Sequence, residues 1–322
     1  MKKLLQAAAA VACLTAAGPA LAQQQLSIAT GGTGGVYYPV GGGLAELINR
    51  HLENSAAVAE VTGASVENVA LIHRGDTDLA IALGDSVQQG YLGTGQFEGR
   101  QAGGVRVIAS LYPNAVQIVT PAGSDIHSLD DLRGKRVSVG APGSGTEVNA
   151  RALLQAKGMS YDDLGATQRL NFNETADALR DGDIDAGIWS VGPPTSSIMS
   201  LATTRAIRLV PISDDEVAAA REVEPIFSPY TLPAGIYEGV SEDIGTVAIP
   251  NVLIASEEMD DDLAYELTKL LYERLDELVA IHPAAGDTSV EFTMASSPVP
   301  LHAGAIRYYE EIGAEIPDHL RD

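Results

Sequence analysis

The sequence has one cysteine, few lysines and no apolar run long enough for a clear membrane anchor, and each shortage excludes a class of protein. The only cysteine, Cys13, lies in an N-terminal segment that we expect to be removed. The mature chain then has no disulfide, no thiolate nucleophile and no cysteine-ligated metal. Only five of the 20 basic residues are lysines, against 43 Asp and Glu, which gives a net charge of −23. Such a surface repels nucleic acid and anionic lipid, so we exclude a nucleic-acid or membrane-surface partner.

The N-terminus is typical of a cleaved signal peptide. Two lysines precede the apolar stretch 4–17, and the small residues of Ala20-Leu21-Ala22 predict cleavage before Gln23. We therefore expect residues 1–22 to be removed and the mature protein to be periplasmic. The alternative, lipidation at Cys13, fits the preceding residues weakly. Export argues against ATP or nicotinamide chemistry, because those cofactors stay in the cytoplasm. We expect no cofactor and no bound metal.

The order of predicted elements indicates an α/β protein with two similar halves. Short apolar strands alternate with amphipathic helices, and each half opens with a strand, a loop of small residues and a helix. Boundaries are predicted near residues 112–114 and 245–250. We expect lobe I to comprise residues 23–113 and 247–322, and lobe II residues 114–246, with a hinged ligand cleft between them. The strongest helix signal covers residues 261–281, and residues 91–104 are expected to form an exposed loop.

Three loops of small residues are the first candidate binding elements. Thr30-Gly31-Gly32-Thr33-Gly34-Gly35 and Gly143-Ser144-Gly145-Thr146 each stand before a helix, and Gly63-Ala64-Ser65 repeats the arrangement. Small residues let a ligand approach the N–H groups at a helix start, where an anion is favoured. Three such helix starts facing one cleft would hold a carboxylate without a basic side chain. The alternative is that these loops are tight turns with ordinary N-caps.

Three further positions have two readings each. Tyr37 and Tyr38 follow the first loop and could form a ligand wall with hydroxyl donors, or could pack in the core. Trp189, the only tryptophan, ends an apolar strand and could line a cleft or lie in the core. Asp85 follows the apolar strand 79–83 and could bind an amino group of a ligand or cap a helix.

Signatures of enzymes are incomplete. No lysine follows Gly35 as a Walker loop requires, and Tyr37 replaces the third small residue of a dinucleotide fingerprint. Pro142 replaces the first glycine of a nucleophile elbow around Ser144. The six histidines are scattered, and the acidic run 181–185 is better explained as a helix-to-strand turn than as a calcium loop. We therefore expect a binding protein rather than an enzyme. The alternative is a secreted hydrolase with Ser144 as nucleophile and a histidine nearby.

A resemblance to a known family covers essentially the mature chain. Residues 26–41, centred on Thr30-Gly31-Gly32-Thr33-Gly34-Gly35-Val36-Tyr37-Tyr38-Pro39, resemble the opening signature of the TAXI solute receptors. These are the extracytoplasmic binding proteins of one branch of TRAP transporters. The resemblance continues through segments 131–137, 143–147, 181–186, 301–305 and 308–309.

This resemblance implies a type II periplasmic binding protein fold that closes around a small organic acid of the glutamate or 2-oxoglutarate class. The receptor, expected to be a monomer, would then deliver the acid to TRAP membrane subunits. A ligand sensor without a transporter is the alternative. From the matching positions and the residues above, the candidate ligand-binding residues are Thr30, Gly34, Gly35, Tyr37, Tyr38, Ser65, Asp85, Ser144, Gly145, Thr146 and Trp189.

Overall fold

The computed structural model describes residues 23–321. The predicted signal peptide, residues 1–22 with Cys13, lies outside the described residues. Within residues 23–321, none of the helices combines the length and the apolar character that crossing a membrane requires.

One hydrogen-bonded network joins ten strands in the order β2-β1-β3-β10-β4-β7-β5-β6, with β8 added beside β4 and β9 beside β10. Two parallel groups, β2-β1-β3 and β6-β5-β7, flank the antiparallel pair β4 and β10. The strands are β1 (Gln24–Ala29), β2 (Ser55–Glu60), β3 (Leu79–Leu83), β4 (Val105–Pro121), β5 (Arg136–Ser138), β6 (Ala166–Gln168), β7 (Ala186–Val191), β8 (Ile207–Val210), β9 (Ser228–Leu232) and β10 (Ile244–Ser256). Parallel strands joined through helices confirm the predicted α/β class.

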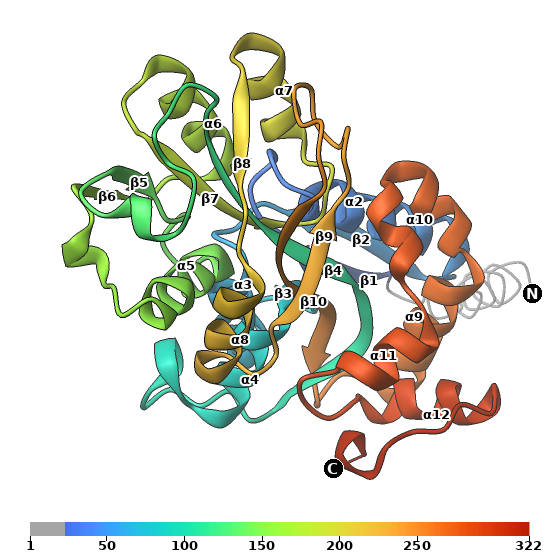
Figure 1. Ribbon diagram of the computed structural model, residues 1–322. Coiled ribbons are helices and arrows are strands. Elements are labelled where there is room, and N and C mark those ends of the chain that lie inside the picture. The colour runs from blue at the N-terminus through green and yellow to red at the C-terminus, as the bar shows by residue number, and fades with distance from the viewer. Residues whose placement is uncertain (1–22, 322) are drawn as a thin grey trace, which may run out of the picture.

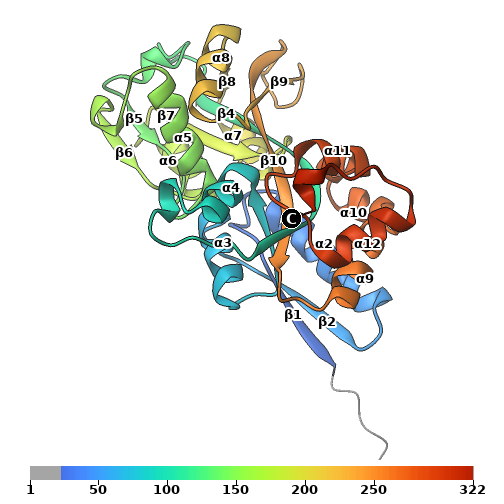
Figure 2. The same cartoon turned by 90° about the horizontal axis from the view of Figure 1, so that it is seen from below.

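The long strands β4 and β10 connect two halves of the molecule, which Figure 2 shows on either side of them. Pro113 and Pro250 lie opposite each other in this pair, next to a register shift between Pro250 and Val252. Proline has no N–H for the ladder, so the pairing is weakened at this level. The predicted boundaries at 112–114 and 245–250 thus fall inside strands that run without a break from one half to the other.

Helices cover the sheet in both halves (Figure 1). They are α2 (Tyr37–His51), α3 (Ser65–Arg74), α4 (Gly84–Leu92), α5 (Gly145–Ala156), α6 (Phe172–Asp181), α7 (Ser196–Thr204), α8 (Asp214–Val223), α9 (Asp261–Glu273), α10 (Leu275–Ile281), α11 (Val290–Ser296) and α12 (Ala303–Glu311). Local signals fix several starts: the capping boxes Asn171/Glu174 and Ser213/Glu216 each satisfy backbone N–H groups at the starts of α6 and α8.

Two expectations about elements were wrong. The helix predicted over residues 261–281 is two helices, because Arg274 leaves the helical conformation (φ −120°, ψ 21°) after its N–H closes the last turn of α9 on Leu270 O. The break lets α10 contact α2, while α9 packs on α12. Residues 91–104 are not only a loop: they include the end of α4 and a short 3-10 helix, Gly95–Phe97, whose Phe97 is buried.

The packing of α12 on α9 makes a prediction about glycine. A Cβ atom at Gly304 would lie 2.8 Å from both Ala264 Cβ and the Tyr265 nitrogen, so backbone would have to shift. We expect Gly304→Ala to lower the free energy of unfolding by about 1–3 kcal/mol. Gly42 in α2 is the matched control, because a Cβ there meets nothing within 4 Å. Gly42→Ala should raise stability by about 0.5–1 kcal/mol. Urea unfolding of the two variants tests this, and equal effects would contradict it.

Candidate functional site

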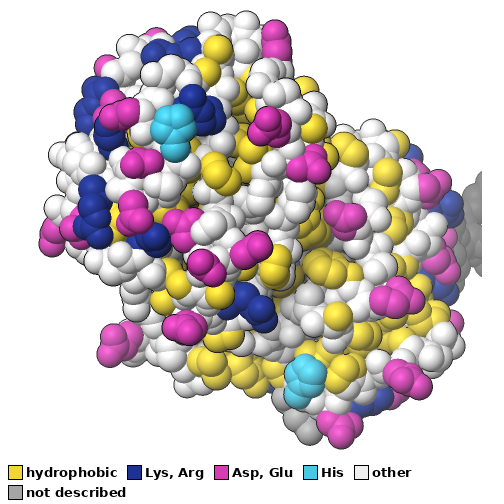
Figure 3. Space-filling view, in the orientation of Figure 1, with side chains coloured by type: hydrophobic (Ala, Val, Ile, Leu, Met, Phe, Trp, Pro, Cys, Tyr) yellow, Lys and Arg dark blue, Asp and Glu magenta, His cyan; other side chains and the backbone are white. Residues whose placement is uncertain are grey.

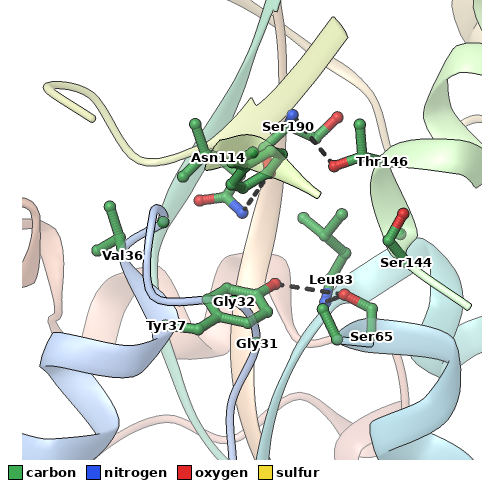
Figure 4. Close-up of a pocket in the computed structure, with 15 residues that line it drawn as sticks. Gly31, Gly32, Val36, Tyr37, Ser65, Leu83, Asn114, Ser144, Thr146 and Ser190 are labelled. Atoms are coloured by element: carbon green, nitrogen blue, oxygen red, sulfur yellow. Dashed lines mark hydrogen bonds between the residues drawn. The ribbon is translucent and has the colours of Figure 1, made fainter. Parts of the chain in front are cut away.

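A small cavity lies where the two halves meet, at the starts of α2, α3 and α5 and the ends of β3 and β7 (Figure 4). Its volume is about 40 Å³, against about 10–15 Å³ for one water molecule. Among residues 23–321, none that lines the cavity is charged. The lining consists of Gly31, Gly32, Gly35, Val36, Tyr37, Ala64, Ser65, Leu83, Asn114, Ser144, Gly145, Thr146, Phe172, Ser190 and Val191.

The start of α5 offers unpaired donors to the cavity. Ser144 is the N-cap: its Oγ accepts from Glu147 N–H at 3.2 Å and donates to Ala141 O at 2.7 Å. Both local bonds occupy this hydroxyl, so Ser144 positions the helix rather than presenting its proton. Gly145 and Thr146 are the first two residues of α5, so their N–H groups have no partner within the helix, and the helix dipole favours negative charge at this end.

The start of α3 is occupied by the opposite half. Val66 and Glu67 donate their N–H groups to Gly143 O at 3.1 and 3.2 Å. At this helix start, one of the three expected to face a ligand, two N–H groups are therefore already bonded to the protein and are not available to a ligand. Ser65 still lines the cavity, and its Oγ accepts from Leu83 N–H at 3.1 Å.

Tyr37 forms one wall, and hydrogen bonds fix its ring. Its hydroxyl donates to Asn251 Oδ1 at 2.5 Å and lies 3.4 Å from Ser65 Oγ. Burial raises the pKa of Tyr37 well above its ordinary value, so the hydroxyl stays neutral. Figure 4 shows this hydroxyl directed at Ser65 below Asn114. The wall is thus rigid and uncharged.

Glycines allow the two halves to touch around the cavity. A Cβ at Gly145 would lie 2.5 Å from Leu83 Cδ1 and 2.8 Å from Ser65 Oγ. A Cβ at Gly34 would collide in the same way with the Asn173 side chain, and the Gly34 carbonyl accepts from Ser196 Oγ at 3.3 Å and Ser197 N–H at 3.4 Å. Larger residues would hold the halves apart, so the loops need glycine for close approach.

Six of the predicted site residues line the cavity: Gly35, Tyr37, Ser65, Ser144, Gly145 and Thr146. Thr30 does not line it and is buried, and its hydroxyl donates to Glu60 O at 2.6 Å. Gly34 lies in the contact just described. Tyr38 is 39% exposed on α2, outside the lining.

Trp189 lies behind the cavity wall in the core. It is fully buried, its Nε1 donates to Ser197 Oγ at 3.2 Å, and its ring stacks on Phe172 with centroids 6.1 Å apart. Phe172 lines the cavity, so the tryptophan supports the wall instead of forming it. Of the two interpretations of Trp189, cleft wall or core, the structure places the side chain in the core.

Asp85 also lies outside the lining, in the first turn of α4. It is fully buried and accepts from Ser86 N–H at 2.6 Å and from Asn149 Nδ2 on α5. Burial, together with the nearby Glu224 carboxylate, raises the pKa of Asp85 to about 7. It therefore joins α4 to α5 beside the cavity, without facing it.

Sequence reasoning missed two polar residues of the lining, Asn114 on β4 and Ser190 on β7. Both are almost fully buried, and Asn114 Oδ1 and Ser190 Oγ have no hydrogen-bond partner among the described residues. Their neighbourhood follows from the β4–β7 register, which pairs Val116 with Ser190. No local sequence signal marks such a pair.

The arrangement offers little for hydrolysis. Ser144 Oγ donates to a backbone carbonyl, and none of the histidines in residues 23–321 lines the cavity. The same stretch holds no cluster of three His, Cys, Asp or Glu side chains suited to a metal ion. Residues 181–185 form the predicted helix-to-strand turn: Gly182 ends α6 in the left-handed conformation, and Asp185 pairs with Arg136.

Comparisons with known proteins agree with this architecture. The sequence model of the NMT1-like family matches residues 28–313. A Xanthomonas citri protein bound to ATP is similar in structure, with TM-score 0.52 at 14% identity over 90% of this chain and 99% of that chain. A putative L-cystine ABC transporter from Listeria monocytogenes gives 0.51 at 15% identity over 83% and 99%. The periplasmic aliphatic sulphonate binding protein SsuA from Escherichia coli gives 0.49 at 14% over 90% and 88%. The predicted two-lobed α/β fold is confirmed.

The raised pKa of Asp85 predicts how stability depends on pH. The ordinary pKa of Asp is about 3.9, so between about pH 4 and 7 folding takes up a proton at Asp85. This contribution to the free energy of unfolding is full below about pH 4 and is lost as the pH rises through 7. Asp85→Asn removes it, so from pH 5 to pH 8 the variant should gain roughly 2 kcal/mol relative to the wild type in urea unfolding.

Asp131 provides the control. The N–H of His127 and the hydroxyl of Ser128 lower the pKa of Asp131. Its carboxylate is therefore ionised in both folded and unfolded chains above pH 5, so the effect of Asp131→Asn should be the same at pH 5 and 8. A pH-independent effect of Asp85→Asn would contradict the assignment.

Proposed function

The chain belongs to the NMT1-like family, and on that basis we propose that it is an extracytoplasmic solute receptor. It captures a small organic acid between two lobes and passes it to a TRAP-type permease. The observation that carries this proposal is the cavity between the halves, whose described lining is uncharged and includes the first two residues of α5. The N–H groups of these two residues suit recognition of a carboxylate, and the lining suits binding without a chemical step.

The lobes we propose are residues 23–113 with 247–322, and residues 114–246. β4 and β10 cross between them, and the weakened pairing at Pro113 and Pro250 suits a hinge. A ligand that touches both lobes binds the closed form better than the open one, so it shifts the equilibrium by that difference in affinity. Ser65 and Thr146 line the cavity from the two lobes and would be bridged in this way.

Neutral donors, not surface charge, would attract the acid. The mature chain has 18 basic and 43 acidic residues, and on the face in Figure 3 the acidic side chains are spread over both halves. Long-range attraction for an anion is therefore absent, and affinity must come from short-range hydrogen bonds inside the cavity. The N–H groups of Gly145 and Thr146 and the helix dipole behind them supply those bonds.

The location rests on the predicted signal peptide, residues 1–22, and the partner on the resemblance of residues 26–41 and the later motifs to TAXI receptors. On that basis the receptor is periplasmic, acts as a monomer and delivers its ligand to TRAP membrane subunits. Glutamate and 2-oxoglutarate, the ligands implied by the same resemblance, are the reference compounds for the first test.

A thermal-shift panel on the mature protein tests the proposal. It includes L-glutamate, L-glutamine, 2-oxoglutarate, C4 dicarboxylates and short monocarboxylates. A ligand at about a hundred times its Kd adds about 2.7 kcal/mol and raises Tm. Gly145→Ala should weaken binding at least tenfold, because its Cβ meets Leu83 and Ser65 across the cavity. The control is Gly123→Ala, whose Cβ meets nothing within 4 Å and should leave affinity unchanged.

Two outcomes would contradict the proposal. A folded protein whose Tm no acid changes would exclude this ligand class. Chemical conversion of a bound acid, followed by NMR and lost in Ser144→Ala, would instead indicate the hydrolase.

A further inference from the structure

Two buried polar atoms of the cavity lack the partner that burial demands. Asn114 is 1% exposed and Ser190 4%, and neither Asn114 Oδ1 nor Ser190 Oγ has a hydrogen-bond partner among the described residues. Leaving such atoms unpaired costs about 1–3 kcal/mol each. Both residues line the cavity, so a ligand there is the natural source of the missing bonds.

The backbone of Ser190 fixes which end of the Asn114 amide stays free. Asn114 Nδ2 donates to Ser190 O at 3.2 Å. Rotating the amide by 180° would place its oxygen against that carbonyl, so that two acceptors would face each other. The nitrogen therefore stays on Ser190, as the dashed line in Figure 4 shows, and Oδ1 is the free group. Asn114 offers the ligand an acceptor.

The backbone N–H of Ser190 likewise leaves the Thr146 hydroxyl as a donor. Ser190 N–H donates to Thr146 Oγ1 at 3.3 Å, so the threonine proton is free to point elsewhere. Beside it are the unpaired N–H groups at the start of α5. The N–H and C=O of Ser190 thus orient Thr146 as a donor and Asn114 Oδ1 as an acceptor in the same cavity.

We infer that the ligand is a 2-hydroxy acid, whose carboxylate accepts from Thr146 and the start of α5 and whose hydroxyl donates to Asn114 Oδ1. This inference rests on the proposed function and narrows its ligand class. A 2-oxo acid would set its keto oxygen against an acceptor and leave Asn114 unpaired. A 2-amino acid brings a charged ammonium with three donors, and no carboxylate lines the cavity to neutralise it. Ser190 Oγ can serve the hydroxyl as a second partner.

Matched acids that differ only at carbon 2 test the inference by titration calorimetry on the unmodified mature protein. The three-carbon set is lactate, pyruvate, alanine and propionate, and the five-carbon set is 2-hydroxyglutarate, 2-oxoglutarate, glutamate and glutarate. Both enantiomers of the hydroxy and amino acids are used. In whichever set binds, one hydroxy enantiomer should bind at least tenfold more tightly than the oxo, amino and unsubstituted acids.

Two serine variants provide a matched pair. Ser190 and Ser110 are both buried with an unpartnered Oγ, but only Ser190 lines the cavity. Ser190→Ala should lower the affinity for the hydroxy acid three- to tenfold, and Ser110→Ala should leave that affinity unchanged. Asn114→Ala should reduce the hydroxy-to-oxo affinity ratio to near one. If Asn114→Ala does not fold, the serine pair and the unmodified protein still decide the question.

The outcomes separate this inference from the proposed function. Binding of the acids with equal affinity for hydroxy and oxo members would overturn the inference and leave the receptor proposal standing. Tightest binding of an amino acid would overturn it as well. Failure of both sets to bind would overturn the inference, and failure of the whole thermal-shift panel as well would overturn the proposed function.

Discussion

The carbonyl oxygen of Gly143 accepts two N–H groups from the start of α3, and this contact holds the two halves together beside the cavity. The bond joins a loop of one half to a helix of the other, a few residues from Ser65 and Gly145, which touch at the edge of the cavity. It also satisfies donors that would otherwise be left unpaired in a closed molecule. The donors at the start of α3 are therefore satisfied without an anion, and a ligand in the cavity would meet the helix starts of α2 and α5 and the side chains of the lining.

Because the lining carries no charge, hydrogen-bond geometry must distinguish ligands. No Lys or Arg of residues 23–321 lines the cavity. Lys135 pairs with Asp125 and Arg136 with Asp185 on the outer surface, where such pairs contribute little to stability. A carboxylate in the cavity would be held by N–H and O–H groups that are fixed before it arrives. Fixed dipoles cost little reorganisation, which suits a receptor that must also release its ligand.

Sequence patterns predicted the loops of the site but not all of its side chains. Gly35, Ser65 and Gly145 follow from a strand, a small-residue loop and a helix, which is a local pattern. Asn114 and Ser190 come together only through the pairing of β4 with β7, a contact 76 residues apart that no local pattern encodes. Ser144 shows the converse limit: its position was predicted, but the bond to Ala141 O that occupies its hydroxyl depends on the turn. The break at Arg274 was missed because the leucine stripe continues through it.

The protonation of Asp85 would depend on how closely the two proposed lobes pack. It comes from α4 and accepts from Asn149 of α5, the helix whose start faces the cavity, while Gln89 of α4 donates to Glu224 at 3.3 Å. In the lobes proposed here, each of these bonds crosses the cleft and brings two carboxylates near each other. Opening would return Asp85 to water and move its pKa down toward the ordinary value, since burial is the largest cause of its shift. Closure of the proposed lobes would then take up a proton, so rising pH would weaken the closed form, although none of residues 23–321 that line the cavity is charged.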